Sequence, residues 1–282
     1  MVLEQLFKEK WLEKRPLFAF LIGVIYSLIG ILFAYLIFPN SFGMMSVSFT
    51  SILIIPSLNI LLSHEENIEI REKKLSIKLL FQDHKDIFEI YLFIFLGIFL
   101  VFSMISLVIP KGRLMALFPN QFRAAGILGN SLNWGYFRTI LFNNILVLFT
   151  CFILSFFYGA GSVIFLTWNS STWGILFGYL VQDTVANSGK NVFLYFFLML
   201  LPILPHMITE AISYLSASIV GGVISKAVIK EKIFSEKFNH VITDGIIFLV
   251  LSLVMILIAA FIEMVYIDFY FFFFYLIFFY LI

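Results

Sequence analysis

Residues 17–38 read LFAFLIGVIYSLIGILFAYLIF, an unbroken apolar run. A helix rises 1.5 Å per residue, so about 20 apolar residues cross the ~30 Å hydrocarbon core of a bilayer. Other apolar runs begin near residues 44, 87, 140, 163, 192 and 245. They are continuous rather than alternating, which favours helices over a membrane barrel. The predicted fold class is therefore all-α, a polytopic transmembrane helix bundle.

The composition of the whole chain agrees with this prediction. Of its 282 residues, 62% are hydrophobic and 12% are charged, and the mean hydropathy is +1.04. A soluble domain carries about 25% charged residues, so this chain could not cover a soluble fold with a polar surface. We expect one integral membrane domain over residues 1–282, with the lipid bilayer as a partner. The net charge of +1 argues against nucleic acid, and the single Cys151 excludes a disulfide framework within the chain.

About seven spans are expected, and the sixth is unusual. The run 192–229 would be about 57 Å long as one helix, too long for a single crossing. Pro202 and Pro205 are expected to break it into a broken or re-entrant half-helix and a full span. The tail 269–282 is too short for an ordinary straight crossing, so it either lies at the interface or re-enters. The predicted spans are residues 17–38, 44–62, 87–109, 140–158, 163–181, 205–229 and 245–266.

Three segments lie outside these spans. Residues 1–16 are expected to form an interfacial helix, because apolar residues recur at helical spacing among lysines and Arg15. Residues 63–86 are predicted to be a cytoplasmic amphipathic segment with interleaved acidic and basic side chains. Residues 110–139 mix cations with aromatic residues, which is typical of short interfacial helices, here on the opposite side.

The distribution of Lys and Arg predicts the orientation. If the N-terminus is cytoplasmic, 13 of the 18 Lys and Arg residues lie on the cytoplasmic side. Cytoplasmic loops are enriched in these residues. This favours a multi-pass protein of the cell membrane with its N-terminus in the cytoplasm, provided that residues 192–229 cross only once.

Ionisable side chains inside a span are functional-site hypotheses by default. His206 and Glu210 follow Pro205 and are four residues apart, so they share a helix face. One interpretation is a buried acid–base pair for ion or proton handling. The other is a hydrogen-bonded pair that holds helices together. No third ligand is visible at convincing spacing, so neither a metal site nor a cofactor is expected.

Four further polar residues lie in or near the spans. Asn143 and Asn144 open the span at residue 140, where helix capping is the simplest interpretation. Asn169 lies in mid-span, so its amide is expected to find partners on neighbouring helices. Glu263 lies near the end of the last clear span and either snorkels to the interface or faces the bundle.

Small residues predict where helices approach closely. Gly174 and Gly178 form a small-xxx-small pair, which more often serves packing inside a bundle than a dimer face. Gly221 and Gly222 follow the His206–Glu210 segment and suit close helix–helix contact. The sequence contains no phosphate loop, no H-E-x-x-H, no G-x-S-x-G and no dinucleotide fingerprint, so we do not expect an enzyme.

An ordered set of these motifs resembles the stage II sporulation protein M family in its archaeal form. The family usually has glycine where this chain has Ser170 and Met207. The residues that carry the resemblance are Glu65-Glu66 with His84, Asn143-Asn144, Gly159/Gly161, Asn169, Gly174/Gly178, Pro205-His206 with Glu210, Gly221-Gly222 and Ala259-Ala260-Phe261-Ile262-Glu263.

The resemblance implies a role without catalysis. Bacterial members are membrane scaffolds that hold cell-wall hydrolases during spore engulfment. We therefore expect a scaffold with a membrane or cytoplasmic protein partner, and a homo-oligomer stays open. The alternative is a transporter or permease-like subunit that uses the His206/Glu210 broken-helix site, because half-helices at the midplane build substrate sites.

Overall fold

The computed structural model describes residues 16–69, 85–124, 134–159, 162–186 and 191–280. This part of the chain is almost wholly α-helical and holds no strand, which confirms the predicted all-α bundle. The elements are α3 (Pro16–Ile37), the 3-10 turn η1 (Pro39–Ser41), α4 (Phe42–Glu69), α6 (Lys85–Val108), α7 (Lys111–Leu117), α8 (Pro119–Ala124), α9 (Trp134–Tyr158), α10 (Val163–Ala186), α11 (Val192–Lys230) and α12 (Glu236–Tyr280).

Six of the described helices are long and apolar enough to cross a membrane: α3, α4, α6, α9, α11 and α12. A seventh helix, α10, has 24 residues, which is also enough length for a crossing. Its hydropathy is lowered by the polar run from Asn169 to Thr172. The described residues therefore hold six candidate spans, and α10 is the predicted span that is not among them.

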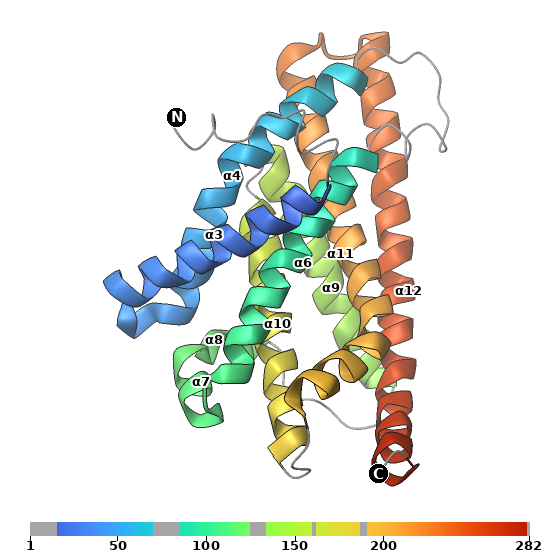
Figure 1. Cartoon of the computed structure of the whole chain (residues 1–282). Helices are drawn as coiled ribbons and strands as arrows, with labels where there is room; N and C mark the ends of the chain where they lie inside the picture. The colour runs from blue at the N-terminus through green and yellow to red at the C-terminus, as the bar shows by residue number, and fades with distance from the viewer. Residues whose placement is uncertain (1–15, 70–84, 125–133, 160–161, 187–190, 281–282) are drawn as a thin grey trace.

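The helices pack in two groups that meet in the middle of the molecule. One group is α3, α4, α6 and α10, and the other is α9, α11 and α12 (Figure 1). In the first group, α3 crosses α6 at Gly23 and Gly97. A Cβ added to either glycine would overlap the backbone of the opposite helix, at Ile94 or Phe20 respectively. The polar side chains that weaken the hydropathy of α4 are satisfied within it, since Ser46, Thr50 and Ser51 donate to carbonyls four residues earlier.

The prediction that Pro202 and Pro205 break the helix is wrong. Helix α11 continues through both prolines, and Figure 1 shows its first turns running at an angle to the rest. Proline removes a backbone hydrogen bond and clashes with the preceding turn, which bends a helix. Within a bundle, neighbouring helices and local adjustments can satisfy the freed groups, so the helix bends without ending.

The tail also differs from the prediction. Helix α12 runs from Glu236 to Tyr280 as one element of 45 residues, so the tail continues the same helix instead of forming a separate element. The candidate span ends at Val265, and the position of the tail relative to the membrane stays a prediction. No glycine or proline occurs between Gly245 and Tyr280 to end the helix. Residues 281–282 lie outside the described residues.

The segments predicted to lie outside the membrane are described only in part. Helix α4 extends to Glu69, past the predicted end of its span. Residues 1–15 and 70–84 lie outside the described residues. Beyond Pro110 the chain forms the short helices α7 and α8, while residues 125–133 are again outside the described part. The interfacial positions of residues 1–16 and 110–139 and the cytoplasmic position of residues 63–86 stay predictions.

Candidate functional site

Three helices bring polar side chains together around Glu210 of α11. The Asn144 Nδ2 atom of α9 donates a hydrogen bond to Glu210 Oε1 at 2.5 Å. Both side chains are buried, with 3% of Glu210 and 6% of Asn144 exposed. Glu263 of α12 lies close enough to Glu210 for the two carboxyl groups to interact electrostatically. Two acidic groups and an amide therefore meet where α9, α11 and α12 pack.

A second layer of side chains closes this cluster one turn further along α11. Tyr214 is 2% exposed and lies within electrostatic reach of Glu210, Glu263 and Cys151. The side chains of Cys151 and Ser218 are hydrogen-bonded to each other. Ser218 Oγ in turn donates to the Tyr214 carbonyl at 2.7 Å. The sequence predicts no role for Cys151 in this cluster. Its spacing of seven residues from Asn144 is the available signal, because residues seven apart share a helix face.

The capping interpretation of Asn143 and Asn144 is wrong. Helix α9 begins at Trp134, earlier than the predicted start at residue 140, so both asparagines lie inside the helix. Adjacent residues cannot share a helix face. Asn144 therefore points inward to Glu210, while Asn143 is exposed on the outside of the bundle.

His206 and Glu210 do not form a hydrogen-bonded pair in the described part of the chain. The hydrogen bond to Glu210 comes from Asn144 instead. The imidazole ring lies beside Trp173 of α10, with 6.0 Å between ring centroids. The His206 Nδ1 atom is buried and has no hydrogen-bond partner among the described residues. The two residues share a helix face but have different surroundings.

The two remaining polar residues of the predicted site are Asn169 and Glu263. Asn169 Nδ2 donates to the Phe165 carbonyl of its own helix at 2.8 Å, so the expected partner on a neighbouring helix is not the one it uses. Glu263 lies near the end of the candidate span Glu236–Val265, as predicted, although helix α12 continues to Tyr280. Its interaction with Glu210 favours the bundle-facing alternative over snorkelling.

The glycines of the predicted site lie at close helix contacts. A Cβ on Gly174 would stand 2.8 Å from the Phe99 carbonyl oxygen of α6, and one on Gly178 would stand 2.7 Å from that of Ser103. Gly221 faces α9, where a Cβ would overlap the Phe152 carbonyl. The next residue, Gly222, is buried within α11.

Neutral polar groups accompany the glycines between α6 and α10. Ser170 Oγ donates to the Phe95 carbonyl at 2.7 Å, and Ser106 Oγ donates to the Ile175 carbonyl at 2.7 Å. Ser170 stands where the resembling family usually has glycine. This chain thus gains an interhelical hydrogen bond at a point of close approach.

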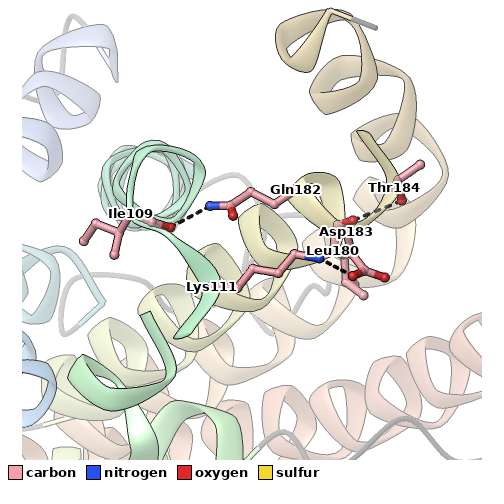
Figure 2. Close-up of polar contacts among 6 residues, drawn as sticks. All are labelled: Ile109, Lys111, Leu180, Gln182, Asp183 and Thr184. Carbon is pink, nitrogen blue, oxygen red and sulfur yellow. Dashed lines mark hydrogen bonds and ion pairs between the residues drawn. The ribbon is translucent and has the colours of Figure 1, made fainter. Parts of the chain in front are cut away.

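The ends of α6 and α10 are joined by the contacts that Figure 2 shows. Gln182 Nε2 of α10 donates to the carbonyl of Ile109 at 2.8 Å and also to that of Ser106. The last carbonyls of a helix lack partners within it, so Gln182 supplies them. Beside it, Lys111 forms an ion pair with Asp183 and lies 5.4 Å from the centre of the Tyr179 ring. The sequence holds no local signal for this cluster, because its members are about 70 positions apart.

The described part of the chain contains a small cavity and no cluster of metal ligands. Among the described residues, no group of three or more His, Cys, Asp or Glu side chains could hold a metal ion. A small cavity between α6, α11 and α12 is lined by Phe88, Ser216 and Gly245 among others, and it includes none of the polar site residues.

The fold and this cluster define an integral membrane protein that has acidic side chains, Glu210 of α11 and Glu263 of α12, where its helices pack together. The family model described as stage II sporulation protein M matches residues 89–266, which include α9, α10 and the whole Glu210 cluster. The chain belongs to that family. No curated protein and no solved structure matches it.

Proposed function

We propose that this protein is a non-enzymatic membrane scaffold that positions a membrane or cytoplasmic partner protein. The observation that carries the proposal is the closed packing around Glu210, which is 3% exposed and hydrogen-bonded to Asn144. A polar group that serves helix packing needs neighbouring helices, whereas a transport site needs access to water. The resemblance adds support, since bacterial members of the family are scaffolds.

We also infer that the protein is a multi-pass protein of the cell membrane with a cytoplasmic N-terminus. The support from sequence is the excess of Lys and Arg on the side that would hold the N-terminus. The contact between Gln182 and Ile109 puts the ends of α6 and α10 together, which fits the alternation of the predicted spans in either orientation. Accessibility of single cysteines to a membrane-impermeant reagent tests it; labelling of the N-terminus from outside intact cells would contradict it.

The test of the scaffold is chemical cross-linking in native membranes, followed by purification in a mild detergent. We expect at least one other protein at a constant ratio to the chain, recovered equally with wild type and with Glu210→Gln. The substitution keeps the size of the side chain and an oxygen that can accept from Asn144. A chain that always elutes without any other protein would count against a scaffold.

One observation favours transport as a second candidate. Glu210 and Glu263 interact electrostatically across α11 and α12, and α11 bends near Pro202 and Pro205. Bent or broken helices near buried charges are typical of transporter sites.

Flux measured in vesicles that contain the purified protein separates the two candidates. Transport predicts that Glu210→Gln abolishes a flux that Glu236→Gln, at the exposed start of α12, leaves intact. If neither variant changes the flux of any tested cation or proton, the scaffold stands.

A further inference from the structure

Asn143 is an amide on the outer surface of the bundle, inside a predicted span. It is exposed, and it lies within the candidate span Phe137–Tyr158, about 9 Å along the helix from Phe137. It has no hydrogen bond with the described residues. Lipid tails offer no hydrogen-bond partner, so an amide left facing them is costly. The described part of the chain therefore supplies no partner for this amide.

The residues that share the face of Asn143 form a regular stripe along α9. Their spacing alternates between three and four residues, which is the pattern of a coiled-coil seam. Leu146, Ile153 and Phe157 are 51%, 48% and 70% exposed. Thr150 Oγ1 donates to the carbonyl of Leu146 at 2.7 Å, which leaves its methyl group to the surface. The outer α9 stripe consists of Asn143, Leu146, Thr150, Ile153 and Phe157.

The opposite stripe of the same helix is already used within the chain. Asn144, Leu148, Cys151 and Ser155 are buried against the bundle, with exposures between 0% and 6%. Helix α9 thus carries two seams, each with an asparagine at nearly the same depth. The inner asparagine has Glu210 as its partner, and the outer one is still unpaired within the described chain.

We propose that the outer α9 stripe binds the same stripe of a second copy of this chain, with the two Asn143 side chains hydrogen-bonded to each other. An amide carries both a donor and an acceptor, so it is its own complement. Two copies inserted in the same orientation, and related by a twofold axis along the membrane normal, bring Asn143 to the same depth. An unrelated partner would need a polar residue at that depth by coincidence. A twofold interface uses the same patch on both copies.

Pairing of the two Asn143 side chains would fix the register between the two α9 helices as well as strengthen their association. A single asparagine at a core position of a coiled coil fixes the register and the number of strands. Interhelical hydrogen bonds in membranes contribute about 0.6 kcal/mol on average and up to about 1.7, which corresponds to about three- to twentyfold in association. This inference goes beyond the proposed scaffold role and does not depend on it.

Cross-linking in membranes tests the geometry. In a Cys151→Ala background, Leu146→Cys is expected to give covalent dimers on mild oxidation. The matched control is Leu28→Cys on α3, which is exposed to the same degree, at 52%. It is expected to give few or none. Equal cross-linking at both positions would overturn the proposal, because it would indicate random collision.

Resonance energy transfer between labelled chains in phosphatidylcholine vesicles tests the role of Asn143. We expect Asn143→Leu to weaken association about three- to twentyfold and Asn143→Gln, which keeps both donor and acceptor, to retain most of it. Elution of all variants as a single folded species separates assembly from folding. Monomers at every protein density, or unchanged association in Asn143→Leu, would overturn the proposal.

Discussion

The contact between α6 and α10 and the contact among α9, α11 and α12 solve the same problem with different chemistry. Both lie inside the bundle and both bury polar groups. Between α6 and α10, hydroxyl groups donate to backbone carbonyls, as Ser170 does to Phe95 and Ser106 does to Ile175. Among α9, α11 and α12, the polar groups are the buried side chains of Glu210 and Asn144 and the partly buried carboxyl group of Glu263.

The two contacts differ in whether their side chains can change charge. The first contact has neutral donors, acceptors that cannot titrate, and glycines that let the backbones approach. The hydrogen bonds of Ser170 and Ser106 do not change with protonation, and the Lys111–Asp183 ion pair lies beyond the end of α6. The second depends on groups whose charge can change, so a proton or a cation could alter it. We therefore expect substitutions in the first contact to act through packing and those in the second to act through hydrogen bonding and charge.

The largest effect is expected at Gly178, on the α6–α10 contact. A Cβ there would stand 2.5 Å from Ser106 Cβ and 2.7 Å from the Ser103 carbonyl oxygen, so Gly178→Leu has no room without moving α6. Overpacking of this kind costs about 3 kcal/mol or more. The measurement is the yield of a single folded species in detergent and its thermal midpoint. Gly112→Leu is the control, because a Cβ at Gly112 meets nothing within 4 Å; equal losses in both variants would contradict close packing at Gly178.

The next effect concerns Asn144, in the contact with acidic groups. Asn144→Leu removes the donor to Glu210 and leaves a buried carboxyl group without that hydrogen bond, at a cost of about 2 kcal/mol. Unfolding is measured at low protein density, where association does not contribute. Asn143→Leu serves as the control and is expected to leave unfolding nearly unchanged, because that side chain is exposed. Equal destabilisation by both substitutions would mean that the inward position of Asn144 is not what matters.

These two asparagines also mark how far sequence reasoning reaches. The apolar runs predicted the helices well, because each run must bury its backbone in lipid. They did not predict which asparagine faces inward. That depends on the rotation of α9 about its axis, which packing against α11 decides. The start of α9 was also misplaced, since Trp134 and the residues after it are less apolar than the span that follows.

The partner of Glu210 shows the same limit. Spacing within one helix put His206 and Glu210 on one face, and that much is local information. The donor came from α9, which lies 66 residues earlier in the chain. Pro202 and Pro205 were read as a break by the rule for isolated helices, whereas the bundle retains a bent helix. Contacts between distant segments have no signal in a single sequence.

A smaller effect is expected for Glu210→Gln. The amide oxygen can still accept from Asn144, so the hydrogen bond between α9 and α11 is kept. We expect a change of less than about 1 kcal/mol in the free energy of unfolding, because the substitution conserves the volume of the side chain and its acceptor. Glu236→Gln on the exposed start of α12 should also change stability little. A clear loss of stability in Glu210→Gln alone would show that the carboxyl group itself, and not only the hydrogen bond from Asn144, holds the three helices together.

The smallest effect is expected for Lys111→Met, in the ion pair that Figure 2 shows at the end of the α6–α10 contact. The side chains of Lys111 and Asp183 are 31% and 64% exposed, and exposed pairs contribute about 0–1 kcal/mol. We expect a loss of about 0.5 kcal/mol that disappears at high salt, because screening already weakens the pair in the wild type. Arg113→Met removes the same charge from a neighbouring exposed position and controls for net charge. The contact should survive, because Gln182 still donates hydrogen bonds to the carbonyls of Ser106 and Ile109. A loss of stability as large as that of Gly178→Leu would mean that charge, and not close packing, holds α6 to α10.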